Sequence, residues 1–207
     1  RIGALPEPAQ VLGDLQRAAD LLRPFAHSAE GSRQSKVIYA DILNYRSHEL
    51  GKEDAVEACE KARQILSGVG ALDLTDLTAA SVYADTADSQ ARHSLELGRL
   101  EDAERLEREV YEIAEAVLAR RPGDLRSMKN RALAADLLGR IAMRRGDFAT
   151  ASEFAERSEQ ASDDIVRFNP SDVGSWVYLV RASSRIANVL YQQGRLRDAL
   201  AKLESNV

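Results

Sequence analysis

The stretch LGRLEDA, from Leu97 to Ala103, nearly repeats the stretch LGKEDA, from Leu50 to Ala55. In both, a helical pattern ends at a glycine and a second helical pattern follows. The same setting occurs five times, with the marker glycines at Gly3, Gly51, Gly98, Gly146 and Gly194, which are 48, 47, 48 and 48 residues apart. A period this regular, and of this length, predicts a linear array of stacked supersecondary units.

A second marker recurs with the same period in the other part of the unit. Pro122 and Pro170 are 48 residues apart, and each is followed two positions later by an aspartate, Asp124 or Asp172, that suits the N-cap of a new helix. The marker glycines suit a left-handed turn at a helix C-terminus, because glycine has no Cβ to clash there. Each unit is therefore predicted to contain a helix A, a tight glycine turn, a helix B and a looser turn.

The predicted fold is all-α, with about nine helices arranged as antiparallel hairpins. The expected helices cover residues 8–27, 32–50, 53–68, 76–97, 100–121, 125–145, 148–168, 172–193 and 196–205. They form a single array, divided into a partial repeat at 1–30 and repeats at 31–73, 74–122, 123–170 and 171–207. Because Gly3 is itself a marker, residues 1–3 are expected to be the tail of a further A helix, and the chain a fragment of a longer protein.

Small residues recur at fixed positions in the A helices. Alignment on the marker glycines gives one column of Ala40, Ala87, Ala135 and Ser183, and a second column, four residues later, of Asn44, Ala91, Gly139 and Ala187. Positions four apart lie on one helix face, so this face is expected to allow close packing of neighbouring helices. Ala103, Ala151 and Ala199, five residues after their glycines, are expected to play the same part in the B helices.

The stretch LLGRIAMRRGDFATASEFA, residues 137–155, resembles the tetratricopeptide repeat. Its motif positions are held by Leu138, Gly139, Ala142, Gly146, Ala151 and Ala155, and in the next unit by Ile186, Ala187, Leu190, Gly194 and Ala199. The resemblance implies a right-handed α-solenoid whose A helices line a concave surface that binds a protein or peptide segment. The unit of 47 to 48 residues exceeds the usual ~34 and resembles arrays of bacterial signalling proteins, which implies a scaffold module in a larger regulatory protein and a cytoplasmic location.

Three columns of the A helices are the candidate peptide-binding groove. They lie ten, six and three residues before each glycine: Asp41, Asp88, Asp136 and Ser184; Tyr45, Arg92, Arg140 and Asn188; His48, Leu95, Met143 and Tyr191. Steps of four and three keep the columns on one helix face, where Arg92 and Arg140 suit the capture of carboxylates. The alternative is that Asp88–Arg92 and Asp136–Arg140 are ordinary pairs four residues apart that support their own helices.

Other classes of function find less support in the sequence. A net charge of -5 gives no general attraction to nucleic acid, and no apolar run approaches the ~18 residues of a membrane span. The single cysteine, Cys59, is expected to be buried, and His27, His48 and His93 fall at different helix phases, so no metal site is expected. Without a catalytic or cofactor-binding motif, neither an enzyme nor a cofactor is expected.

A second function remains open. The last expected helix carries Leu196, Ala199, Leu200 and Leu203 on one face, with no following helix in the sequence to cover them. Because arrays need covered ends, such a face suits an interface between copies of the chain, or a peptide-sensing regulatory domain that acts through its terminal hairpins.

Overall fold

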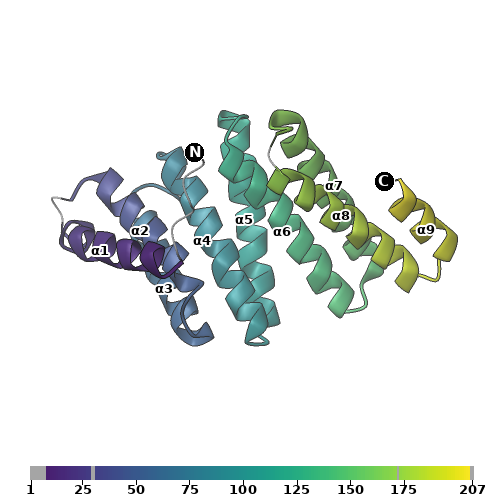
Figure 1. Cartoon of the computed structure of the whole chain (residues 1–207), viewed down its shortest axis with the longest axis horizontal. Coiled ribbons are helices and arrows are strands. Elements are labelled where there is room, and N and C mark those ends of the chain that lie inside the picture. Colours follow the sequence, from purple (N-terminus) through teal and green to yellow (C-terminus); the bar gives the residue numbers. More distant parts are fainter. Residues whose placement is uncertain (1–7, 29–30, 172, 206–207) are drawn as a thin grey trace.

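The computed structural model describes residues 8–28, 31–171 and 173–205, and within these ranges the chain forms nine α-helices and no strand (Figure 1). The helices are α1 (Pro8–Ala26), α2 (Arg33–Ser47), α3 (Lys52–Ser67), α4 (Leu77–Glu96), α5 (Leu100–Arg120), α6 (Leu125–Arg144), α7 (Phe148–Phe168), α8 (Val173–Gln192) and α9 (Leu196–Glu204). The predicted all-α fold is confirmed. Gly3, and with it the predicted tail of a further A helix, lies outside the described residues.

The helices stack side by side as antiparallel hairpins along one long axis (Figure 1). Each helix packs on the next one in the chain, and the A helices also contact one another across hairpins: α2 contacts α4, α4 contacts α6, and α6 contacts α8. The B helices α3, α5 and α7 each fill the space between two A helices. The A helices therefore share one side of the array, as the repeat pattern predicts, and we call the solvent-exposed part of that side the inner face.

Left-handed glycines form three of the tight turns. Gly98, Gly146 and Gly194 have φ angles of 77°, 75° and 76°. In each turn the residue after the glycine donates its N–H to a carbonyl one turn back in helix A, as in the 3.0 Å bond from Asp147 to Ala142. This geometry requires a residue without a Cβ, which explains why glycine recurs at this period.

The turn at Gly51 differs from the prediction. Gly51 has φ -59° and is the N-cap of α3, and α2 already ends at Ser47, three residues before the predicted limit. The LGKEDA version of the motif is one residue shorter than LGRLEDA. The hairpin of α2 and α3 consequently turns without a left-handed residue.

Aspartates cap the A helices α4 and α6, and Asp124 does so as the second marker predicts, whereas Ser32 caps α2. Asp124 accepts a hydrogen bond from the backbone N–H of Ser127 at 2.9 Å, and Asp76 accepts two from Thr78 and Ala79 at 3.0 Å each. These bonds satisfy N–H groups that the first helical turn leaves free. The corresponding residue of the next unit, Asp172, lies outside the described residues.

The small columns are buried and let the helices approach closely. All eight residues of the two columns are buried, and beside Gly139 the backbone of α7 comes within 3.5 Å of the point where a Cβ would stand. The main apolar cluster surrounds α4, which is the most deeply buried A helix, and Cys59 is fully buried as predicted. The helices α4 to α8 have 20 or 21 residues, so each is about 30 Å long.

Candidate peptide-binding face

Two adjoining hollows lie on the inner face. The first, a cavity of about 220 Å³, lies between α6 and α8 with α7 as its floor, and we call it the arginine pocket. Its charged or phenolic lining residues are Arg92, Asp136, Arg140, Tyr178, Arg181 and Arg185. The second, of about 310 Å³, is lined by residues of α2, α4, α6 and α8, and we call it the central hollow. Leu133 and Tyr178 border both, so the two hollows form one depression across four A helices.

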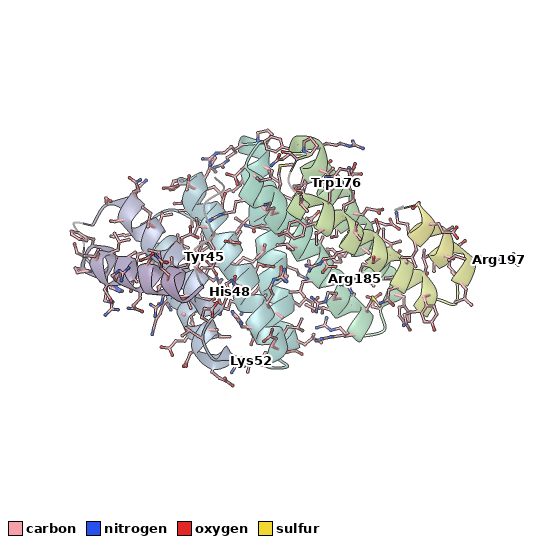
Figure 2. The ribbon with its side chains drawn as sticks, viewed as in Figure 1. Tyr45, His48, Lys52, Trp176, Arg185 and Arg197 are labelled. Atoms are coloured by element: carbon pink, nitrogen blue, oxygen red, sulfur yellow. The ribbon has the colours of Figure 1, made fainter. Side chains whose placement is uncertain are left out.

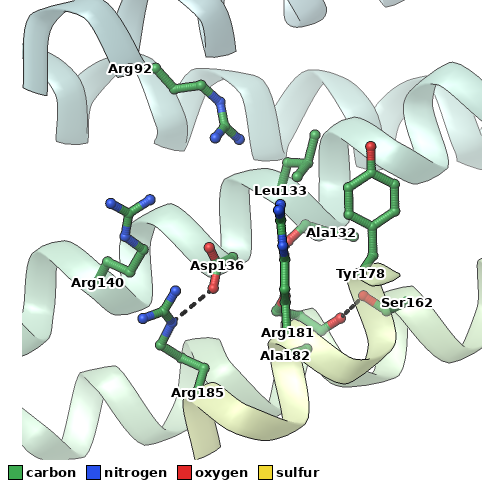
Figure 3. A pocket seen from close by; sticks show the side chains of 11 residues that line it. Arg92, Ala132, Leu133, Asp136, Arg140, Ser162, Tyr178, Arg181, Ala182 and Arg185 are labelled. Carbon is green, nitrogen blue, oxygen red and sulfur yellow. Dashed lines mark hydrogen bonds and ion pairs between the residues drawn. The ribbon is translucent and has the colours of Figure 1, made fainter. Parts of the chain in front are cut away.

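Two of the four arginines in the pocket are neutralised by carboxylates. Arg185 donates from Nε to Asp136 at 3.0 Å, and Arg92 donates two hydrogen bonds to Asp88, at 2.8 and 3.0 Å. Figure 3 shows the four guanidinium groups arranged around Asp136. Among the described residues, neither Arg140 nor Arg181 has a hydrogen bond or an ion pair.

Like charges crowd the unpaired Arg140. Partial burial, together with the guanidinium groups of Arg185, Arg92 and Arg144, lowers the pKa of Arg140, although Asp136 opposes this effect. For Arg92 the balance is the reverse, because the Asp88 carboxylate outweighs burial and raises its pKa. In the described part of the chain, Arg140 therefore has no ion-pair partner of its own and lies among other guanidinium groups, with Asp136 as a counter-charge that it shares with Arg185.

A buried carboxyl group lies behind Arg92 and Asp88. Glu107 of α5 is completely buried, and neither of its oxygens has a hydrogen-bond partner of ordinary geometry among the described residues. Burial first, and then the nearby Asp88 carboxylate, raise the pKa of Glu107 well above its usual value. The four arginines of the pocket thus face two carboxylates, Asp88 and Asp136, and the raised pKa of Glu107 disfavours a third negative charge beside them.

The central hollow contains charges of both signs, with Arg126 and Lys129 beside Asp85. Arg126 of α6 reaches past α4 to Asp41 of α2, and donates to its two carboxylate oxygens at 3.1 and 3.2 Å. Asp85 of α4 lies beside this pair and accepts a hydrogen bond from Asn44 at 3.2 Å. Burial raises the pKa of Asp85 to about 6, against the opposing charge of Arg126. Tyr45 lines the same hollow with about half of its surface exposed.

The predicted groove residues divide by exposure. Tyr45, His48, Ser184, Asn188 and Tyr191 are exposed; Asp41, Arg92, Asp136, Arg140 and Met143 are half-buried; Asp88 and Leu95 are buried. Figure 2 places Tyr45 and His48 toward the α1–α2 end and Arg185 nearer the other end. Within the set, the arginine pocket brings together Arg92, Asp136 and Arg140, whereas Tyr45 lines the central hollow.

Two of these expectations need correction. Leu95 packs in the main apolar cluster, so it does not line a groove on the inner face as its column predicts. The Asp136–Arg140 pair does not form, because Asp136 binds Arg185 of the neighbouring A helix instead. The alternative interpretation is confirmed only for Asp88 and Arg92, which do pair within α4.

Several important side chains were missed by the three columns. Asp85, Leu133 and Arg181 all stand thirteen residues before their glycines, one further step of three along the same helix face. That signal was present in the sequence. Arg126, Tyr178 and Arg185 lie outside every column, and only the inter-helix geometry brings them to the hollows.

Two histidines approach each other despite their different positions in the repeat. The rings of His48 and His93 are 5.6 Å apart, and burial together with His48 lowers the pKa of His93. A difference in helix phase therefore does not keep these two rings apart. In the part of the chain that the structure describes, no three His, Cys, Asp or Glu side chains gather in a way that could hold a metal ion.

The length and composition of the helices were compared with those of membrane-spanning helices. None of those within the described ranges combines the length and the apolar character needed to cross a bilayer.

Comparison with known proteins gives similarity in structure only. No protein-family model and no curated protein matches the sequence. Among solved structures, the chain is similar to a de novo designed helical repeat protein, DHR64, with 21% identity, a TM-score of 0.44, and coverage of 97% of this chain and 92% of that one. It is similar also to the DHF58 filament, with 20% identity, a TM-score of 0.43, and coverage of 96% and 92%.

Proposed function

We propose that the chain is a binding module whose inner face holds a segment of a protein or peptide, either from a partner or from the same parent chain. The observation that carries the proposal is the depression shared by α2, α4, α6 and α8, which contains the unpaired Arg140 and Arg181. A rigid array that presents unpaired cations in a cavity is suited to recognition. The tetratricopeptide-like pattern supports a place in a cytoplasmic bacterial signalling or regulatory protein.

The lining of the depression favours an extended ligand. Arginines dominate one end, Leu133 and Tyr178 lie in the middle, and Tyr45 with Asp85 lies toward α2. A segment with acidic residues followed by an apolar or aromatic residue would complement the first two parts. The module acts in this proposal by binding and not by catalysis, since Arg140 and Arg181, the unpaired groups that line the depression, are guanidinium groups suited to holding an anion.

The test is selection of binding peptides from a random library displayed on phage, followed by affinity measurement with synthetic copies. Arg140→Glu/Arg181→Glu reverses the two unpaired charges without breaking an ion pair. The control is Arg105→Glu/Arg197→Glu, which makes the same charge change on α5 and on α9 and, within the described ranges, loses only the exposed Asp102–Arg105 pair. Figure 2 shows Arg197 far from Arg185.

Selected peptides are expected to be rich in acidic residues and to lose at least tenfold in affinity for the pocket variant, with little change for the control. Peptides that bind both variants as tightly as the parent chain would contradict a role for the inner face. Circular dichroism melting of each variant verifies that it is folded.

A second candidate is self-association through α9. Leu196, Leu200 and Leu203 are 59%, 57% and 47% exposed on one face of this helix. Burying such a face against a second copy would stabilise a dimer by removing apolar surface from water. Light scattering of the parent chain should then give twice the monomer mass, and Leu200→Glu/Leu203→Glu should restore the monomer. A parent chain that stays monomeric at high protein concentration would exclude this candidate.

A further inference from the structure

We propose that the arginine pocket binds a phosphate monoester dianion, carried as a phosphorylated side chain by the segment that occupies the inner face. The pocket itself stands on its own geometry, and only the source of the phosphate rests on the proposed function. A carboxylate is the other anion that could bind these arginines. The charge and the arrangement of donors favour the phosphate, and the size of the pocket accommodates it.

The charge of the pocket fits a dianion. Arg92 and Arg185 each have one carboxylate partner, whereas Arg140 and Arg181 have none among the described residues. Two uncompensated guanidinium groups match the charge of about -1.5 to -2 that a phosphate monoester carries at pH 7. A carboxylate would neutralise only one of them.

The donors approach from more than one helix. Arg140 belongs to α6 and Arg181 to α8, and the guanidinium of Arg92 reaches toward the same space from α4 (Figure 3). A planar carboxylate is satisfied by one guanidinium fork, but the tetrahedral phosphate has three terminal oxygens that suit donors from several directions. The ring of Tyr178 forms part of the wall beside these donors.

The carboxylates already in the pocket have hydrogen-bond partners other than Arg140 and Arg181. Asp136 is bound by Arg185 and Asp88 by Arg92, so each is committed to a neighbour. Asp136 acts on Arg140 only through its charge, so the N–H donors of Arg140 and Arg181 stay available to an incoming anion. Because each carboxylate is paired with a guanidinium group, it repels an incoming anion less than an unpaired carboxylate would.

The size of the cavity fits a phosphoryl group and the atoms that carry it. At about 220 Å³ it has the volume of roughly seven water molecules, at ~30 Å³ for each. This leaves room for the four oxygens of a phosphate ester and for the carbon attached to it. The shared border with the central hollow at Leu133 and Tyr178 gives the rest of a bound segment a path away from the pocket.

The test uses four small probes with the full chain: N-acetyl-phosphoserine amide, N-acetyl-O-sulfoserine amide, N-acetyl-glutamate amide and inorganic phosphate. Binding is measured by isothermal titration calorimetry and by the shifts of the arginine Nε–Hε resonances. O-sulfoserine is the important comparison, because it has the shape of phosphoserine with a single negative charge. The variants are Arg140→Gln/Arg181→Gln and, as a control with equal loss of charge, Arg105→Gln/Arg197→Gln.

We expect phosphoserine amide to bind at least fivefold more tightly than either singly charged probe. Its affinity should fall at least tenfold in the Arg140→Gln/Arg181→Gln variant and change less than twofold in the control. Equal affinity for phosphoserine, sulfoserine and glutamate would overturn the preference for a dianion. Equal weakening in the two double variants would reduce the effect to net charge and overturn the site.

The outcomes also separate this inference from the proposed function. Tighter binding of phosphoserine amide than of inorganic phosphate supports a phosphorylated side chain as the source, whereas the reverse would overturn that source and leave a free phosphate site. If unphosphorylated peptides from the library bind at the inner face and no probe binds, the phosphate inference fails alone. If the probes bind and no peptide does, the peptide-binding function fails alone.

Discussion

Arg126 donates two hydrogen bonds to Asp41, although 85 residues and the whole of α4 separate them in the chain. The pair joins the first and third complete A helices directly, at the edge of the central hollow. The contact is possible because the A helices lie on the same side of the array. The ion pair thus links two hairpins that are not nearest neighbours.

The Asp41–Arg126 pair should contribute a small but measurable coupling. Both side chains are about one-quarter to one-third exposed, so solvent screens their interaction. A double-mutant cycle with Asp41→Asn and Arg126→Gln is expected to give about 0.5–1 kcal/mol in urea unfolding. The exposed pair Asp102–Arg105 serves as the control and should give no coupling above error. A zero coupling for Asp41 and Arg126 would mean that the pair does not hold the helices together.

Asp85 should make stability depend on pH. Burial raises its pKa from 3.8 to about 6, so the carboxyl favours the protonated form in the folded state. Its contribution is fully present below pH 4 and is lost as the pH rises through 6. Asp85→Asn should therefore be more stable than the parent chain at pH 7.5, by up to about 3 kcal/mol, and show no such gain at pH 4.

Urea unfolding of Asp85→Asn at the two pH values measures this difference. The exposed Asp73 is a control of opposite sign, because hydrogen bonds from Thr75 lower its pKa. Asp73→Asn is expected to lose stability at pH 7.5. A gain of equal size for Asp85→Asn at both pH values would show that the carboxyl does not change its charge on this interval.

Glu107 offers a test that combines stability with ligand binding. Because its pKa is raised, its contribution is present below the unfolded value near 4.5 and is lost as the pH rises through the folded value. Glu107→Gln should thus raise the free energy of unfolding under alkaline conditions, measured at pH 9, since it removes the cost of ionising a buried acid. At pH 4 it should have little effect.

The same variant reports the charge of the arginine pocket. If Glu107 is protonated at pH 7.5, Glu107→Gln leaves the affinity for phosphoserine amide within twofold of the parent value. A clear increase in affinity would mean that Glu107 is ionised and lowers the positive charge of the pocket. Calorimetry on the folded variant gives the answer.

Two glycines should respond in opposite ways to alanine. Gly146 has φ 75°, a conformation that alanine adopts only with strain, so Gly146→Ala should cost about 1 kcal/mol or more. Gly139 lies inside α6, where an added Cβ would meet its nearest neighbours at 3.5 and 3.6 Å, an ordinary contact distance. Gly139→Ala should therefore stabilise the chain by up to about 1 kcal/mol. Thermal unfolding of both variants checks the pair, and a loss at Gly139 would mean that α6 and α7 cannot tolerate a methyl group between them.

The sequence predicts the array because its local signals repeat. The glycines at positions 98, 146 and 194 and the N-cap at Asp124 mark helix ends that depend only on nearby atoms. Alanine columns likewise predict which helix faces are buried. Gly51 is the exception, because one deleted residue changes the turn without removing the glycine that marks it.

The candidate site could be predicted only in part. The columns placed Arg92 and Arg140 on the correct face, because helix geometry fixes which positions share a face. They could not show that Arg185 takes Asp136 away from Arg140, since that choice depends on the distance between α6 and α8. The exposure of a column residue also depends on how deeply its helix is packed in the array. Leu95 on the central helix α4 is buried, whereas Tyr191 on α8 is 60% exposed.

The position of the arginine pocket has a consequence for motion. Arg181 and Arg185 belong to the α8–α9 hairpin, which contacts the rest of the described array only through α6 and α7. If this terminal hairpin separates from the array, two of the four guanidinium groups leave the pocket with it. An anion held between α6 and α8 would act as a clasp that suppresses such fraying, so occupancy would be read out as slower amide hydrogen exchange in α8 and α9.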